Sequence, residues 1–333
     1  MTEIENRAQR APAKIVNPPW RVLIGSRSFG QSDPNHLTQL AAAGCEVIPN
    51  TVGRGYRAAE LLEALRGVDA IITGTDELTA EVIEHADRLK TIAKHGVGLD
   101  NIDLDAARAR GISVTATPGA IHDAVADLTL GLLLALVRQI VPSHLSVQAG
   151  QWKRFIGYEL RDKTLGIVGL GRIGKEVCLR AQAFGMRVLA YDLYPDQGFA
   201  SQHNVIFMPL DELLQQSDVV SLHAPPTGDD KPLLGERELA LLKPAAYLIN
   251  TARGQLVDEV ALAAALKTGQ LAGAGLDVFV DEPPKGSPLL GLDNVVLTSH
   301  IAGQTVEGQR RMGDITLENC LRALRGQKPL YQV

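Results

Sequence analysis

The sequence predicts an α/β protein made of two doubly wound, parallel-sheet domains. Three observations support this prediction. Short apolar runs alternate with helical patterns along the chain, as in a parallel sheet whose strands are linked by helices. The 333 residues suit two domains at roughly 100–200 residues each. The composition, with 45% hydrophobic and 21% charged residues, is that of an ordinary globular protein.

The first series of alternating elements covers the N-terminal third of the chain. Helical patterns at 34–43 and 58–65 separate its first three strands. A long helix from about 120 to 150 is expected to follow the series. Because this helix is apolar nearly all round its middle, we expect it to be buried against a second domain or a second subunit. The strands are predicted at 21–25, 46–49, 70–74, 89–93 and 112–115.

A second series of strands and helices begins at Thr164. One helix is expected at 172–183, and another at 306–324 near the end of the chain. The strands of this series are predicted at 165–168, 187–191, 205–207, 219–222, 246–249, 273–276 and 295–297.

Charge and cysteine content exclude several classes of protein. The net charge of −5 gives no basic footprint for nucleic acid or for an anionic membrane. No apolar stretch approaches the roughly 20 residues of a spanning helix, and residues 1–19 are expected to be a mobile arm rather than a signal peptide. The three cysteines form no C-x-x-C pair, and no His, Cys, Asp and Glu set has metal-ligand spacing. We therefore expect no metal and a reducing, cytoplasmic location.

A nucleotide-binding turn is expected after the first strand of the second series. Residues 169–174 spell G-x-G-x-x-G between an apolar strand and a helix. The first glycine permits the tight turn, the second lets the backbone approach a pyrophosphate, and the third lets helix and strand pack closely. The N–H groups at the helix start favour the anion. The candidate cofactor contacts in this turn are Gly169, Gly171, Arg172, Ile173 and Gly174.

Asp192 predicts which dinucleotide is bound. It ends the strand that follows the glycine-rich turn and its helix, where a carboxylate accepts hydrogen bonds from the adenosine ribose hydroxyls. The carboxylate would repel a 2′-phosphate, and Leu193 and Tyr194 offer no cation to hold one. The sequence therefore predicts NAD rather than NADP.

Several motifs occur together from about residue 70 to the C-terminus. They are Lys94–Asp103 (KHGVGLDNID), the 169–174 turn, Leu222–Thr227 (LHAPPT), Asn250–Gly254 (NTARG), Leu276–Phe279 with Glu282-Pro283, and Thr298–His300. In this order and spacing they resemble the D-isomer-specific 2-hydroxyacid dehydrogenases, above all the D-3-phosphoglycerate dehydrogenase branch in a short form without a regulatory domain. The resemblance implies an NAD-dependent oxidoreductase that transfers a hydride between nicotinamide and a small D-2-hydroxy acid or 2-oxo acid.

The resemblance gives catalytic roles to three residues, and elementary chemistry agrees with each. His300 would be the acid and base, because an imidazole with a pKa of about 6.5 transfers protons in both directions. Glu282 would orient that ring and stabilise its charged form. Arg253 would hold the substrate carboxylate in a two-pronged hydrogen bond and polarise the ketone. Ser299 stands where the family usually has proline, so the backbone before His300 is less restrained.

The resemblance also implies a loop that binds the substrate carboxylate. Gly96, Val97 and Gly98 would do so through their backbone N–H groups, because glycine allows a close approach. Asp277 would accept a hydrogen bond from the nicotinamide carboxamide. The alternative for Asp277 is a strand-end carboxylate that a neighbouring N–H satisfies.

Two further residues are candidate cofactor contacts, His223 and Thr251. His223 is expected at a strand end near the cofactor, although Pro225 and Pro226 suggest that it mainly shapes a turn. We expect no catalytic role for His223 or for His95.

An anionic tail on the substrate would need a cation in the protein. Arg27 follows the first predicted strand, at the end of the sheet where α/β proteins bind ligands, and Lys94 stands just before the glycine loop. Both are candidate substrate contacts, and both are equally well explained as solvated surface cations. The expected substrate is 3-phosphoglycerate or a related anionic acid. Hydroxypyruvate, glyoxylate and a phosphorylated four-carbon acid are open alternatives.

The motifs place the NAD-binding domain inside the substrate-binding one. Residues 1–117 and 300–333 are expected to form a flavodoxin-like substrate domain, and residues 118–299 a Rossmann domain. We expect a homodimer through the apolar 120–150 helix. A non-catalytic, NAD-dependent scaffold like the corepressors of this fold is the alternative from another class, because those proteins keep the same catalytic residues.

Overall fold

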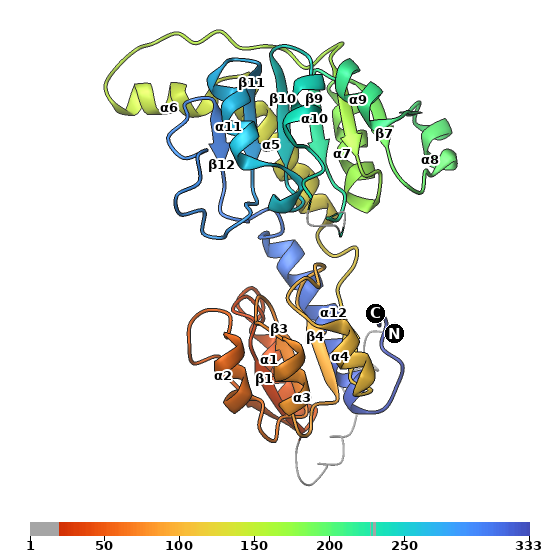
Figure 1. The fold of residues 1–333 in the computed structure, drawn as a ribbon. Coiled ribbons are helices and arrows are strands. Elements are labelled where there is room, and N and C mark those ends of the chain that lie inside the picture. Colours follow the sequence, from red (N-terminus) through yellow and green to blue (C-terminus); the bar gives the residue numbers. More distant parts are fainter. Residues whose placement is uncertain (1–19, 227, 229–230) are drawn as a thin grey trace, which may run out of the picture. The chain divides into compact units, whose positions relative to one another are not determined.

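The computed structural model describes residues 20–226, 228 and 231–333 (Figure 1). The expected arm at 1–19 and residue Thr227 of the 222–227 motif lie outside the described residues. The chain forms two compact units. Unit 1 contains the residues up to Ile121 together with Thr305–Val333, and unit 2 contains His122–Gln304. His300 therefore lies in the same unit as Glu282 and Arg253.

Unit 1 is built on a five-stranded parallel sheet. Its strand order is β2-β1-β3-β4-β5, the flavodoxin-like order, in which the strand sequence reverses between β1 and β3. All five predicted strands are present. The elements are β1 (Trp20–Ile24), α1 (Asn35–Ala42), β2 (Cys45–Ile48), α2 (Ala58–Ala64), β3 (Ala70–Thr73), α3 (Ala80–His85), β4 (Thr91–Lys94), α4 (Leu104–Ala109), β5 (Ser113–Thr115) and α12 (Val306–Leu324).

Helices cover both faces of this sheet. Alternate residues of a strand point to opposite faces, and in β1 Leu23 joins a core with α2, α3 and α4, whereas Val22 and Ile24 join a core with α1 and α12. The helix α12 thus returns from the far end of the chain to complete unit 1. Because both faces are covered, the ligand-accessible part of such a sheet is the edge where its strands end.

Unit 2 carries a seven-stranded parallel sheet in the order β12-β11-β10-β9-β6-β7-β8. Counted from β6, its first six strands follow the 3-2-1-4-5-6 order of a Rossmann fold, so the predicted fold class is confirmed. The elements are α5 (His122–Val137), α6 (Ile140–Gln148), β6 (Thr164–Val168), α7 (Arg172–Ala183), β7 (Arg187–Tyr191), α8 (Gln197–Gln202), β8 (Ile206–Phe207), α9 (Leu210–Gln216), β9 (Val219–Leu222), α10 (Glu236–Leu241), β10 (Ala246–Asn250), the 3₁₀ turn Gly254–Leu256, α11 (Glu259–Lys267), β11 (Leu271–Leu276) and β12 (Val295–Leu297).

The prediction of one long helix over 120–150 is wrong. The structure has two helices, α5 and α6, bent by 64° at a break where Gln139 has a φ of 54°. Pro142 explains the break, because it cannot donate to the carbonyl of Arg138 and its ring would clash with that carbonyl. The carbonyl of Val137, the last residue of α5, accepts from the Tyr158 N–H at 2.8 Å.

The two helices differ in their surroundings. The helix α5 packs against α7 and the sheet of its own unit, so its apolar surface is buried there. The helix α6 carries exposed apolar side chains. Among the described residues no single helix is long and apolar enough to cross a membrane. Only α5 and α6 taken together reach that length and composition.

Candidate functional site

The glycine-rich turn joins β6 to α7 at the point where the strand order of unit 2 reverses. Gly169 has a φ of 94°, a conformation that L side chains rarely adopt, and its N–H donates to the carbonyl of Tyr191 at 2.8 Å. A Cβ at Gly169 would stand 2.7 Å from the carbonyl carbon of His223. Glycine is therefore required here both by the backbone angle and by the neighbouring loop.

The rest of the turn leaves room for a dinucleotide. A Cβ at Gly174 would overlap the carbonyl of Gly169, so only glycine lets α7 start this close to β6. In contrast, no atom lies within 4 Å of a Cβ built at Gly171. The N–H groups of Arg172 and Ile173 open a helix of 12 residues and have no intrahelical partner. This open side of the turn, with its helix N-terminus, fits a pyrophosphate.

Asp192 lies beside the same turn. Its Oδ2 accepts from the N–H of Leu170 at 2.7 Å, and its Oδ1 accepts from the N–H of Tyr194 at 2.8 Å. These bonds fix a half-buried carboxylate at the end of β7. Each oxygen has a second acceptor position, which is what a ribose diol requires.

The two further candidate cofactor contacts, His223 and Thr251, differ in their hydrogen bonds. His223 is bonded through Nε2 to the hydroxyl of Ser221 at 2.8 Å, and its buried Nδ1 has no partner among the described residues. Burial lowers the pKa of His223 to about 3, so the ring is neutral. The hydroxyl of Thr251 instead bonds the hydroxyl of Thr129 at 2.9 Å and thereby links β10 to α5.

His300 and Glu282 form a direct pair in unit 2. His300 Nδ1 lies 2.8 Å from Glu282 Oε2, and the other oxygen, Oε1, accepts from the N–H of Phe279 at 3.2 Å. The two side chains are 52% and 38% exposed, so a substrate can reach them. Since Nδ1 faces the carboxylate, Nε2 is the nitrogen left for proton transfer.

The pair shifts the pKa values of both partners. The hydrogen bond to Glu282 raises the pKa of His300, against an opposing effect of burial. Burial alone would raise the pKa of Glu282, but the hydrogen bond and charge of His300 outweigh it and lower that pKa. Arg253 acts electrostatically on both groups and lowers each pKa.

Asp277 anchors the backbone of His300. Its carboxylate is fully buried, and it accepts from the hydroxyl of Thr298 at 2.6 Å and from the N–H groups of Ile301 and Ala302 at 2.8 Å each. His300 itself has a φ of 55°, an uncommon angle for a residue other than glycine. The bonds to Asp277 hold this strained turn, because they fix the chain on both sides of His300. They leave one acceptor position on Oδ2.

Arg253 is held next to the Glu282 loop by its neighbours. The side chain of Asn250 donates to the carbonyl of Arg253 at 2.8 Å and accepts from the N–H of Ala252 at 3.0 Å. A Cβ at Gly254 would overlap the backbone of Phe279, so the two loops touch only because this residue is glycine. Asn250 was not among the site residues predicted from the sequence, although it ends β10, and Asn at such a position is a known turn signal.

Unit 1 contributes a loop of free backbone donors after β4. Among the described residues, the N–H groups of Gly96, Val97 and Gly98 have no hydrogen-bond acceptor. The Val97 side chain is 43% exposed, so the loop faces solvent. Successive free N–H groups of this kind form an anion-binding nest.

The Lys94 side chain supports this loop through hydrogen bonds. Its side chain is buried, and its ammonium donates to the carbonyl of Gly74 at 2.5 Å and to Asn101 Oδ1 at 2.6 Å. His95 is also buried, with Nε2 3.1 Å from Gln309 Oε1 of α12. Burial lowers the pKa of His95 to about 4. These contacts tie the glycine loop to the β3 loop and to α12.

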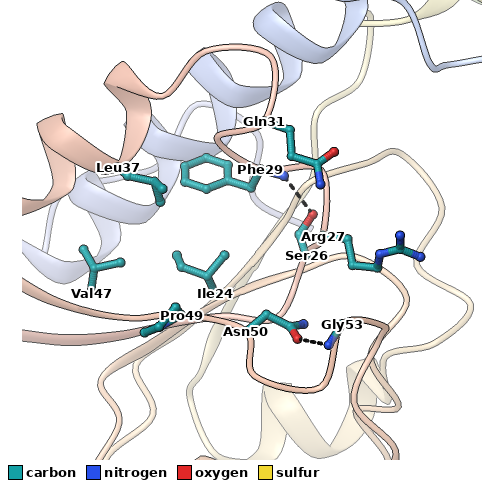
Figure 2. A pocket seen from close by; sticks show the side chains of 10 residues that line it. All are labelled: Ile24, Ser26, Arg27, Phe29, Gln31, Leu37, Val47, Pro49, Asn50 and Gly53. Atoms are coloured by element: carbon teal, nitrogen blue, oxygen red, sulfur yellow. Dashed lines mark hydrogen bonds between the residues drawn. The ribbon is translucent and has the colours of Figure 1, made fainter.

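Arg27 lies on the loop after β1 and is exposed. Together with Ser26 it lines a hollow at the end of the sheet (Figure 2). The loop stands at the reversal point of the unit 1 sheet, between β1 and β3. This is the position where ligands bind in folds of this topology.

One group of metal-type ligands occurs among the described residues. His122, Asp123 and Glu176 place their ligand atoms within 4.8 Å of one another. Arg180 already bridges the two carboxylates, 3.3 Å from Asp123 Oδ1 and 2.6 Å from Glu176 Oε2. Because the guanidinium neutralises them, we assign no metal to this cluster.

A glycine-rich turn at the reversal point of a Rossmann sheet marks a dinucleotide-dependent oxidoreductase, and the accessible His–Glu pair adds a group for proton transfer. Comparison with known proteins defines this class further. The profile of the D-isomer specific 2-hydroxyacid dehydrogenase NAD binding domain matches residues 130–302.

Similar proteins include glyoxylate reductases and a D-3-phosphoglycerate dehydrogenase. The chain is 44% identical over 279 residues to a glyoxylate reductase of Thermococcus litoralis, covering 81% of this chain and 84% of that one. It is also 44% identical over 301 residues to a D-3-phosphoglycerate dehydrogenase of Methanocaldococcus jannaschii, covering 89% of this chain but 57% of that one. The solved structure of a glyoxylate reductase from Paecilomyes thermophila has a TM-score of 0.85 at 32% identity, with 95% and 98% of the two chains covered. The chain belongs to the D-isomer specific 2-hydroxyacid dehydrogenase family, and its predicted cofactor, NAD, is confirmed.

Proposed function

We propose that this NAD-dependent 2-hydroxyacid dehydrogenase reduces a 2-oxo acid with His300 as the proton donor. The observation that carries the proposal is the 2.8 Å bond between His300 Nδ1 and Glu282, which leaves Nε2 free and raises the pKa of the ring. NAD, when bound, supplies the hydride in one direction and accepts it in the other. A protonated His300 gives its proton to the carbonyl oxygen as the alcohol forms, and a neutral His300 removes it in the reverse reaction.

Each unit, taken by itself, carries donors that are proposed to suit a substrate carboxylate. In unit 1 these are the free N–H groups of Gly96, Val97 and Gly98, and in unit 2 the guanidinium of Arg253. Backbone donors and a guanidinium suit a planar carboxylate because both present fixed, diverging N–H bonds. On this basis we propose that unit 1 is the substrate-binding domain.

The cofactor contacts are proposed from the same geometry. The 169–174 turn would hold the pyrophosphate, and Asp192 the ribose hydroxyls. Asp277 would use its remaining acceptor position for the carboxamide while it anchors His300. The orphan Nδ1 of His223 would gain a partner from the cofactor, and Thr251 would support the site through its bond to Thr129.

Among the candidate substrates, acids without a phosphate are favoured by the state of Lys94. A phosphate needs cations, and Lys94 is buried with its ammonium engaged by Gly74 and Asn101. We therefore propose that Arg27 alone binds a distal anionic group of the substrate. Glyoxylate and hydroxypyruvate are supported by the similarity to glyoxylate reductases, and 3-phosphoglycerate by the similarity to a phosphoglycerate dehydrogenase.

Oxidation of NADH in the presence of single 2-oxo acids tests this proposal. We expect turnover with at least one of glyoxylate, hydroxypyruvate, pyruvate and 3-phosphohydroxypyruvate, and loss of that turnover in His300→Ala. A protein that binds NADH but turns over none of these acids would instead be the non-catalytic scaffold. Binding of NADH by fluorescence, measured in parallel, separates that outcome from loss of the cofactor site.

We also propose a homodimer, formed by α6 and the segment that follows it. The helix α5 is buried in unit 2, but Ile140, Leu145, Trp152 and Ile156 are 51%, 57%, 83% and 92% exposed. So many large apolar side chains on one short stretch would be costly in water, and a second copy would cover them. Sedimentation should show a dimer that Ile156→Asp converts to a monomer, while Val260→Asp on α11 leaves it intact. A monomeric parent protein would refute the proposal.

A further inference from the structure

The loop between β11 and β12 carries Glu282. Its two ends are buried in the core of unit 2 through Phe279 and Leu289, which are 5% and 0% exposed. Residues 280–283, which include Glu282, are exposed. The contact with His300 needs one position of the Glu282 carboxylate, because a hydrogen bond weakens steeply with distance and angle. The middle of the loop therefore needs a support of its own.

Glu259, the first residue of α11, bonds both arms of this loop. Its Oε1 accepts from the N–H of Val280 at 3.0 Å, and its Oε2 accepts from the hydroxyl of Ser287 at 2.5 Å. One carboxylate thus joins a residue that precedes Glu282 to a residue that follows it. Both partners are donors, and an ionised carboxylate, which only accepts, suits two donors at once.

The start of α11 does not by itself explain these bonds. An acid at a helix start usually caps the free N–H groups of the first turn. In α11 the preceding residue, Asp258, does so, because its Oδ1 accepts from the N–H groups of Val260 and Ala261 at 2.9 and 3.0 Å. Glu259 instead directs its two oxygens to the loop that carries Glu282.

The bond from Val280 lies directly beside the His–Glu pair. The N–H of Phe279 donates to Glu282 Oε1 at 3.2 Å. The next N–H along the chain, that of Val280, donates to Glu259. The other oxygen of Glu282, Oε2, lies 2.8 Å from His300 Nδ1. A shift of the backbone at 279–280 would therefore move the carboxylate that faces the ring.

We propose that Glu259 is a positioning residue for the acid–base pair, an inference that rests on the proposed function. It holds the loop at residues 280 and 287 so that the Glu282 carboxylate faces His300 Nδ1. Glu259 acts through the loop backbone and not on the reacting groups. Misplacing a group by about 1 Å can cost about 100-fold in rate, so this role should be visible in kcat.

The test compares Glu259→Ala and Glu259→Gln, with the oxo acid that the parent protein reduces fastest among the four named above. Glu259→Ala should lower kcat by about 10- to 100-fold and leave KM for the acid within about threefold. It should also move the fall of kcat with rising pH to lower pH, because a displaced Glu282 no longer raises the pKa of His300. Glu259→Gln should restore the parent values, since its amide can accept from Val280 and donate to the Ser287 hydroxyl.

A double substitution separates positioning from a general loss of stability. In Glu282→Ala there is no carboxylate to position, so adding Glu259→Ala should lower kcat by no more than about twofold. Thermal melting shows that each variant folds. Glu236→Ala, at an exposed acid in the first turn of α10, is the matched control and should change neither kcat nor its pH dependence.

Three results would overturn the inference. They are an equal loss of kcat from Glu259→Ala with and without Glu282, a fall in kcat whose pH dependence stays unchanged, and a Glu259→Gln variant that behaves like Glu259→Ala. Glu282→Gln distinguishes this from failure of the proposed function. If Glu282→Gln moves the pH profile and Glu259→Ala does not, only the positioning role is wrong. If neither moves it, or if the parent protein reduces no acid, the proposed function is wrong as well.

Discussion

The two units hold their functional groups in different ways. In unit 2 the reactive side chains are locked by other side chains, since Glu282 holds the His300 ring and Asp277 holds its backbone. In unit 1 the donors are backbone N–H groups of residues 96–98 and one exposed guanidinium, next to an open hollow. Rigid side-chain geometry suits a reaction that is the same for every substrate, whereas exposed donors suit the recognition of a particular substrate. The difference supports the proposal that unit 2 carries out the reaction and that unit 1 recognises the substrate.

The largest effect should come from the centre of unit 2. His300→Ala removes the proton donor and should lower kcat by about 10²–10⁴-fold, the usual contribution of acid–base catalysis. NADH binding, measured by fluorescence, should stay unchanged because the glycine-rich turn is untouched. Retention of more than a tenth of the parent kcat would show that another group transfers the proton.

A smaller effect is expected from Arg253, the residue of unit 2 that is proposed to bind the substrate carboxylate. Arg253→Ala should raise KM for the oxo acid by about 10- to 100-fold, since a charged hydrogen bond contributes on the order of 1.5–3 kcal/mol. Steady-state kinetics at saturating NADH measure this, with Arg237→Ala, a surface arginine paired to Asp211, as the control. An unchanged KM together with a fall in kcat would remove Arg253 from carboxylate binding.

The preference for NADH over NADPH should change by a smaller factor than these kinetic constants. Asp192→Ala removes the charge that would repel a 2′-phosphate, so the preference for NADH over NADPH should fall by about tenfold, equivalent to about 1.4 kcal/mol. The ratio of the two kcat/KM values checks this. The same substitution also removes the acceptor of the Leu170 N–H. Asp192→Asn, which keeps an acceptor without the charge, therefore separates charge from loop support, and a ratio unchanged in both variants would contradict the ribose role.

The same contrast between units explains how far the sequence alone could be interpreted. The helices at 172–183 and 306–324 and nearly every strand were predictable because local apolar periodicity determines them. The break between α5 and α6 was missed because the effect of Pro142 on Arg138 was outweighed by a long apolar pattern. The His300–Glu282 pair could be expected from motifs. The role of Asp277 could not be settled, because its hydrogen bonds to residues 298–302 depend on the folded loop.

Lys94 and Arg27 show why the substrate could not be predicted from the sequence. Both were candidate cations by position alone, and nothing local distinguished them. Only the fold buries the Lys94 ammonium against Gly74 and Asn101 and leaves Arg27 on the rim of a hollow. Substrate preference depends on such long-range packing, and this is why the reaction class was easier to predict than the acid.

The pH dependence of kcat for 2-oxo acid reduction tests the central claim most directly. Reduction needs protonated His300, and Glu282 raises the pKa of that ring, so kcat should be constant at low pH and fall only above the usual histidine value of about 6.5. In Glu282→Gln the raised pKa is lost, so the fall should move to lower pH, and the rise of hydroxy acid oxidation with pH should move to lower pH as well. A profile that is the same in the parent protein and in Glu282→Gln would contradict the assignment of His300 and Glu282 as the proton-transfer pair.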